Sequence, residues 1–150
     1  MVSEAQVLNA LSNDKSLALF DAIALEGGDS QNIIKRSKLN RKGYYSRISG
    51  LIKSGLVEKR NGKYYLTSFG EVALEARQLI GSAIKDYWRL KAINSIGLEL
   101  PQQERNQIIE ALIDKKEIKE LLLKRAHDVV TEQNQQQKNT HTRRPGTIDL

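Results

Sequence analysis

The chain has 150 residues, with 24 lysine and arginine residues against 18 aspartate and glutamate residues, a formal net charge of +6 and no cysteine. The absence of cysteine excludes disulfides, thiol redox chemistry and cysteine-bound zinc, while the basic charge favours polyanionic partners such as nucleic acid or an anionic membrane. The apolar runs are only a few residues long and no segment resembles a signal peptide, so we expect a cytoplasmic protein that does not enter a membrane.

The first predicted helix follows a weakly amphipathic lead-in, residues 1–12. Asn13 or Asp14 can cap this helix, and Gly27-Gly28 is expected to end it. Its apolar positions recur at a spacing close to that of a helix: Leu17, Leu19, Phe20, Ile23, Ala24 and Leu25.

Two more helices are predicted before the sequence period changes. The second begins at a cap formed by Asp29 or Ser30 and ends near Ser37, with Ile33 and Ile34 facing inward. The third begins at Asn40, a favourable N-cap residue, and runs to about Ser54, where Gly55 stops it. Its apolar face is predicted to hold Tyr44, Ile48, Leu51 and Ile52.

A β-hairpin is predicted next, because residues 56–60 and 63–67 are two short β-like runs joined by Asn61-Gly62. This dipeptide is the strongest short hairpin signal. A long helix capped by Thr67 or Ser68 then runs to a break near Gly97. Its candidate buried residues are Val72, Ala73, Ala76, Leu79, Ile80, Ala83, Ile84, Tyr87, Trp88 and Ile93.

The last third of the chain is predicted to hold two more helices. One begins at Leu100-Pro101, because proline suits a first helical turn. Its apolar stripe is Ile108, Ile109, Leu112 and Ile113, and that of the final helix is Ile118, Leu121, Leu122 and Leu123. From about residue 132 the sequence is polar, rich in glutamine and without periodicity, which predicts a disordered tail.

Positive charge is concentrated in one segment, residues 35–63. Ten basic residues and one acidic residue, Glu58, give this segment a charge of +9, so the remainder of the chain carries −3. Neutralisation of DNA phosphates with release of counterions needs such clustering. We therefore expect the third helix and the hairpin to bind double-stranded DNA.

The predicted fold class is mainly α with a small β-hairpin: a winged helix-turn-helix over residues 1–68, a long helix and C-terminal helices for dimerisation or partner binding over residues 69–131, and the tail over residues 132–150. In such a fold the third helix enters the major groove and the hairpin, called the wing, touches the adjacent backbone. Base contacts are expected from Arg41, Lys42, Tyr45, Ser46 and Ser49, with Gly50 permitting a close approach, and phosphate contacts from Arg47 and Lys53. The wing contributes Arg60, Asn61, Gly62 and Lys63, and Lys38 completes the candidate DNA-binding set.

The stretch YYSRISGLIKSGLVEKRNGKYYLTSFGEVALEA resembles winged-helix transcription regulators of the broad ArsR/MarR-like group, and especially those of the archaeal type. The shared pattern is apolar residues spaced as Ile48 and Leu51 are, then Gly55-Leu56-Val57, Leu66-Thr67 and Gly70. The resemblance covers about residues 14–96. It implies a transcription regulator, usually a homodimer on a palindromic or nearly palindromic site. Some members of that group sense metals through cysteine and histidine ligands. This chain has no cysteine, so the resemblance does not imply metal sensing here.

The predicted long helix offers a seam for a second copy of the chain. Small and apolar residues recur there at nearly heptad spacing: Ala73, Ala76, Ile80, Ala83, Tyr87 and Leu90. The same face could instead pack within its own domain. Tyr87 and Trp88 could anchor an interface, line a ligand pocket or pack in the core, and an effector ligand stays unknown.

Signals of catalysis are missing. His127 and His141 have no second ligand at metal-binding spacing, and no phosphate-cradling GxxxxGK[ST] or GxGxxG motif occurs. We therefore expect no enzyme, metal or cofactor. The alternative is a winged-helix module that binds an acidic protein partner within a transcription or other nucleic-acid assembly, and RNA binding is a third interpretation.

Overall fold

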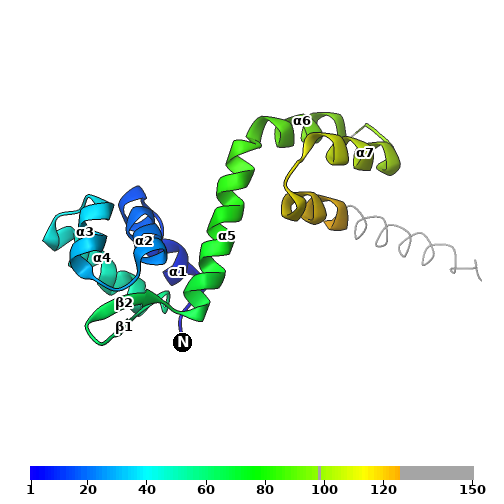
Figure 1. Ribbon diagram of the computed structural model, residues 1–150. Helices are drawn as coiled ribbons and strands as arrows, with labels where there is room; N and C mark the ends of the chain where they lie inside the picture. Colours follow the sequence, from blue (N-terminus) through cyan, green and yellow to red (C-terminus); the bar gives the residue numbers. More distant parts are fainter. Residues whose placement is uncertain (98, 126–150) are drawn as a thin grey trace, which may run out of the picture. The chain divides into compact units, whose positions relative to one another are not determined.

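The computed structural model describes residues 1–97 and 99–125, which form a mainly helical chain with one two-stranded antiparallel hairpin (Figure 1). The chain divides into two compact units, Met1–Gln78 and Leu79–Leu150, which are described separately below. The expected tail, His127 and His141 lie outside the described residues. No helix among residues 1–97 and 99–125 has the length and hydropathy needed to cross a membrane.

The chain begins with a short helix, α1 (Glu4–Ala10), where the sequence indicated only a lead-in. A capping box starts it: the Ser3 hydroxyl accepts the Gln6 N–H at 3.2 Å, and the Gln6 side chain accepts the Ser3 N–H at 2.9 Å. The pairing of serine with glutamine three residues later was the sequence signal that could have predicted this helix.

Three helices follow: α2 (Asp14–Glu26), α3 (Ser30–Ser37) and α4 (Arg41–Lys53). Each begins at a predicted N-cap, Asn13, Asp29 or Asn40, whose side-chain oxygen accepts a backbone N–H of the first turn. These hydrogen bonds satisfy donors that have no partner inside the helix. The predicted stops are also confirmed, since α2 ends at Gly27 and α4 ends before Gly55.

The predicted hairpin is confirmed as β1 (Val57–Arg60) paired with β2 (Lys63–Leu66). Asn61 and Gly62 both have positive φ angles, 50° and 77°, as a type I′ turn requires. One pairing was not predicted. Gly28 forms an isolated antiparallel bridge with Tyr64, with N–H···O distances of 2.7 and 3.0 Å, so that β2 is bonded on both edges.

The core of the first unit is formed by α2, α3, α4 and the hairpin. Its buried side chains are Leu19, Phe20, Ala22, Ile23, Ile33, Tyr44, Ile48, Leu51, Leu56, Val57 and Tyr64. Two residues expected on apolar faces are instead exposed, Leu25 at 71% and Ile52 at 39%. The reason is helical geometry, because Ile52 is turned about 100° from buried Leu51.

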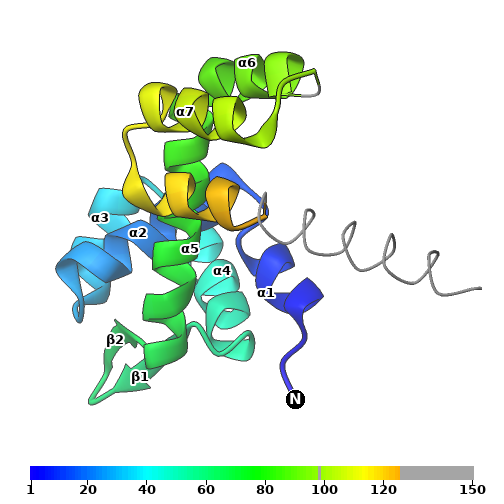
Figure 2. The ribbon, with the colours of Figure 1, turned by 90° about the vertical axis from the view of Figure 1, so that its right-hand side faces the viewer.

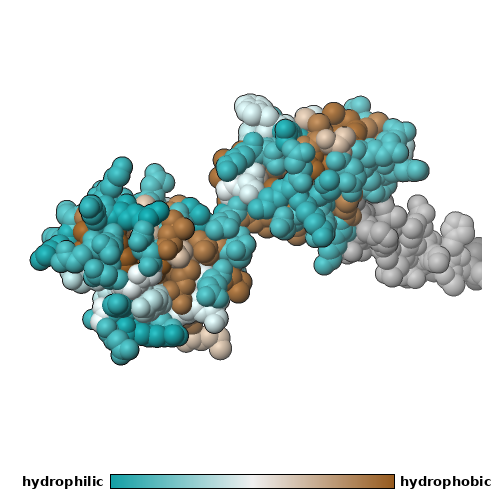
Figure 3. All heavy atoms as spheres, viewed as in Figure 1, coloured by the Kyte–Doolittle hydropathy of each residue, from teal (hydrophilic) through white to brown (hydrophobic). Residues whose placement is uncertain are grey.

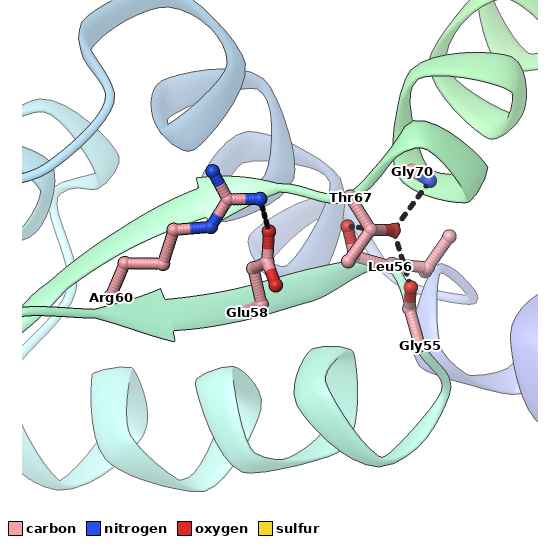
Figure 4. Close-up of polar contacts among 6 residues, drawn as sticks. All are labelled: Gly55, Leu56, Glu58, Arg60, Thr67 and Gly70. Carbon is pink, nitrogen blue, oxygen red and sulfur yellow. Dashed lines mark hydrogen bonds and ion pairs between the residues drawn. The ribbon is translucent and has the colours of Figure 1, made fainter.

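A junction around Thr67 starts the next helix, α5 (Ser68–Lys85) (Figure 4). The Thr67 hydroxyl donates to the Gly55 carbonyl at 2.6 Å and accepts the Gly70 N–H at 2.9 Å, so Thr67 is the cap. A Cβ atom at Gly70 would overlap the Leu56 carbonyl oxygen, so only glycine fits this approach. The residues that carry the family resemblance therefore join α4, the hairpin and α5.

The first unit includes the first turns of α5. Ala73 and Leu74 on these turns pack against the first core, and the unit ends at Gln78.

The second unit contains the end of α5, then α6 (Tyr87–Gly97), α7 (Gln102–Leu112) and a helical segment over residues 116–125. The prediction of one helix reaching Gly97 is wrong, because α5 ends at Lys85. Asp86 lies between the helices and keeps helical bonds to both: its N–H donates to Ser82 and its carbonyl accepts from Leu90. No proline or glycine marks this break. Figure 2 shows α6 and α7 running side by side.

The second core is built from Ile93, Ile109, Ile113 and Ile118, with Ile108, Leu112, Leu122 and Leu123 partly buried around them. The predicted stripe of α7 is confirmed, whereas Leu121 is 55% exposed. Several residues expected to be buried on the long helix are exposed: Val72, Ala76, Ile80, Ile84, Tyr87 and Trp88. The reason is that Ala73 and Leu74 take the inward positions of α5 in the first unit, and Leu79 and Ala83 take them in the second.

Candidate nucleic-acid interface

The outward face of α4, defined by Lys42, Ser46 and Ser49, lies at the protein surface. Lys42 and Ser46 are exposed and Ser49 is half-buried. The opposite face is inside the core, each side chain at most 3% exposed: Tyr44, Ile48 and Leu51. Within the described residues, none of the three outward side chains has an ion-pair or hydrogen-bond partner. They are therefore available to a molecule that covers α4.

Nine of the eleven candidate DNA-binding side chains are exposed, and Arg47 and Ser49 are half-buried. In Figure 3 hydrophilic side chains cover the α3 and hairpin side of the first unit. The structure thus brings the candidates from α4 and the hairpin to the surface of one compact unit.

Tyr44 fixes α4 against its neighbours. Its side chain is fully buried, its hydroxyl hydrogen-bonds to the Ser30 hydroxyl at the start of α3 at 3.0 Å, and its ring packs edge-on against Tyr64 of β2. Burial raises the pKa of Tyr44, and the bond to Ser30 offsets only part of that rise. The hydroxyl therefore stays protonated at neutral pH and continues to tie α3 to α4.

Gly50 leaves a gap on the surface of α4. A Cβ atom placed on it would meet nothing within 4 Å. Glycine inside a helix costs about 0.5–1 kcal/mol relative to alanine, so packing within the chain gives no reason for this residue. A partner that approaches the backbone of α4 closely would give one.

Two of the basic residues in the segment 35–63 form ion pairs within the described chain. Arg36 pairs with Glu26, and Arg60 pairs with Glu58, two residues before it on β1 (Figure 4). Arg60 remains 67% exposed. The local carboxylate makes it a weaker attractor of phosphate than the sequence indicated, and leaves Lys63 as the wing's stronger candidate.

A basic cavity of about 530 Å³ opens beside the start of α4. Its lining residues are Lys15, Lys38, Leu39, Asn40, Lys42, Gly43, Ser46 and Arg47. Four of them were candidates from the sequence. Lys15 was missed, because it lies in the first turn of α2, outside the basic segment, and only packing of α2 near α4 brings it to the cavity.

Two backbone and side-chain details mark this cavity. Lys38 caps α3 in the left-handed conformation, with φ of 53°, which glycine or asparagine usually adopts. Arg47 donates from Nη1 to the Gly43 carbonyl at 3.2 Å, while its Nε is buried without a hydrogen-bond partner. The bond to Gly43 holds the guanidinium against the first turn of α4.

Two carboxylates of the second unit are engaged in ion pairs. Glu110 pairs with Lys119 at 3.1 Å, and Asp114 pairs with Arg89 at 2.9 Å. In residues 1–97 and 99–125, no three histidine, cysteine, aspartate or glutamate side chains gather in a way that could hold a metal ion.

Comparison with models of protein families, with curated proteins and with solved structures gives no match. What this chain does is therefore inferred from its own residues and their arrangement.

Proposed function

We propose that this protein is a sequence-specific DNA-binding transcription regulator with a winged helix-turn-helix. In this proposal α4 enters the major groove and the hairpin is the wing. The observation that carries it is the outward face of α4, where Lys42, Ser46 and Ser49 have no partner within the described residues. Lysine and serine side chains can donate to base edges as well as to phosphates.

The order and attachment of the elements support this proposal. α3 and α4 would be the helix-turn-helix pair, joined by the Tyr44–Ser30 hydrogen bond. The hairpin follows α4 directly and is tied by Tyr64 to Gly28 at the end of α2. A supported hairpin beside an exposed cationic helix is the arrangement that a winged helix uses on DNA.

The test is the double variant Arg41→Ala with Lys42→Ala, measured against DNA recovered by selection from genomic fragments. We expect specific binding to be lost without loss of folding, because both side chains are exposed and outside the core. Binding is followed by fluorescence anisotropy and folding by circular dichroism.

The matched control is Lys116→Ala with Lys124→Ala, which removes the same charge from the helical segment 116–125. Operator affinity in the Arg41/Lys42 variant equal to that of the parent protein would overturn the assignment. Binding without sequence preference that salt removes fully would instead indicate a module for an acidic protein partner, and preference for RNA in competition would indicate RNA binding.

We also propose that the regulator acts as a homodimer through α5. Ile80 and Ile84, one helical turn apart on α5, are exposed at 60% and 68%. Tyr87 and Trp88, which follow α5, are exposed at 55% and 73%, and exposed apolar residues that gather in one region mark interaction surfaces. A second copy would cover this area and supply a second α4 for an adjacent half-site.

A further inference from the structure

We propose that the basic cavity beside the start of α4 holds one backbone phosphate of the bound DNA, with Lys15 of α2 as a contact that only the folded chain provides. This inference deepens the proposed function and rests on it. It assigns to Lys15 a part in binding that the basic segment 35–63 did not include.

Four cations converge on the cavity from three parts of the first unit. Lys15 comes from the first turn of α2, Lys38 from the turn after α3, and Lys42 and Arg47 from α4. No acidic residue lines the cavity. Because like charges repel, this arrangement is unfavourable when the cavity is empty, and an anion relieves the repulsion.

The charges at the cavity are also free of carboxylate partners. In the part of the chain that the structure describes, Lys15, Lys38 and Lys42 form no ion pair, whereas Arg36 and Arg60 each do. The cavity thus concentrates uncompensated positive charge.

The backbone conformation of Lys38 also supports the proposal. Its left-handed conformation is unfavourable for lysine and would be free of strain for glycine. The side chain of Lys38 lines the cavity. A lysine at a position suited to glycine indicates that the ammonium group is needed there.

A phosphate matches this donor set, because ammonium and guanidinium groups bind phosphate oxygens through charge-assisted hydrogen bonds. DNA is the source that fits the surroundings. Lys42 and Ser46 belong both to the cavity and to the outward face of α4, so a strand whose phosphate lies in the cavity runs beside the helix that would read bases. Such a contact fixes the position of the protein on DNA without reading sequence.

The experiment compares the salt dependence of DNA affinity in the parent protein, Lys15→Ala, Lys15→Arg and Lys124→Ala. Lys124 is an exposed lysine outside the basic segment 35–63, and it does not line the cavity. We expect Lys15→Ala to reduce the slope of log affinity against log salt by about one, equally for specific and unrelated DNA. Lys15→Arg should restore the slope, and Lys124→Ala should keep the parent slope. Circular dichroism checks that each variant is folded.

The outcomes separate this inference from the proposed function. If the parent protein binds DNA and Lys15→Ala leaves the slope unchanged, the phosphate assignment is wrong and the DNA-binding proposal stands. If the parent protein binds no DNA, both are wrong. A calorimetric titration with inorganic phosphate is the third arm: saturable binding that Lys15→Ala abolishes, with an unchanged DNA slope, would assign the cavity to free phosphate and overturn the DNA assignment.

Discussion

Gly50 lies within α4, at a position where a Cβ atom would have open space around it. Alanine is the better helix former, so nothing inside the described chain favours glycine at this position. If DNA approaches α4 closely, a methyl group at this position would weaken DNA binding without lowering the stability of the free protein.

We therefore expect Gly50→Ala to raise the free energy of unfolding by about 0.5–1 kcal/mol and to weaken DNA binding. Urea unfolding gives the first quantity and fluorescence anisotropy the second. The matched control is Gly81→Ala in α5, whose added Cβ also meets nothing within 4 Å. Gly81→Ala should stabilise the fold similarly and leave DNA affinity unchanged. Parent-like affinity in Gly50→Ala would show that nothing approaches this side of α4.

At the scale of single residues, the sequence predicts those roles that depend on neighbours a few positions away in the chain. Asn13, Asp29 and Asn40 were recognised as caps because a cap acts on an N–H two or three residues away. Lys15 could not be recognised as a cavity residue, because the residues that line the cavity with it are distant in sequence. The pairing of Arg60 with Glu58 needed the strand geometry, which places alternate residues on one side.

Among the elements, the junction around Thr67 connects α4, the hairpin and α5. One hydroxyl binds the end of α4 and the start of α5 at once. Gly70 allows α5 to approach the Leu56 carbonyl. Thr67 and Gly70 are thus accounted for by the fold, and DNA contact is not needed to explain them.

We expect Gly70→Ala to lower the free energy of unfolding by about 3 kcal/mol. The added methyl group would collide with the Leu56 carbonyl oxygen, a backbone atom that cannot move aside as a flexible side chain could. Urea denaturation followed by circular dichroism measures the change. Gly81→Ala is again the control, since the same substitution in open space should have the opposite sign. A Gly70→Ala protein as stable as its parent would mean that α5 does not pack at this junction.

The order of elements from α2 to the hairpin was predictable, whereas helix α1 and the break after α5 were not. Caps, glycine stops and the Asn61-Gly62 turn are local signals, and each placed its element correctly. The end of α5 has no such signal in the sequence, and Asp86 keeps helical hydrogen bonds to Ser82 and Leu90. After this break, α6 places Ile93 in the second core.

On the scale of the whole molecule, the exposed apolar side of α5 raises the question of assembly. The seam expected from the sequence mixed two kinds of residue. Ala73 packs on the first core and Ala83 and Leu90 pack on the second, while Ala76, Ile80 and Tyr87 are exposed. Periodicity alone could not separate the inward residues from the outward ones, since both recur at helical spacing.

We expect Ile80→Glu to convert a dimer into a monomer, because the change places a charge in the middle of the proposed apolar interface. Light scattering after size-exclusion chromatography measures the mass. Leu25→Glu on α2 is the control, since Leu25 is also exposed, at 71%, but is not part of the proposed interface. A parent protein that is monomeric at every concentration tested would contradict the homodimer and leave DNA binding by single copies to be measured separately.

The partner-free outward face of α4 has a consequence for how such a protein can diverge. Lys42, Ser46 and Ser49 make no bonds that hold the described chain together, whereas the residues of the Thr67 junction do. On the proposed function, substitutions on the outward face would therefore change the operator preference of the protein at little cost in the free energy of unfolding. These three positions could then diverge while the residues of the Thr67 junction stay fixed.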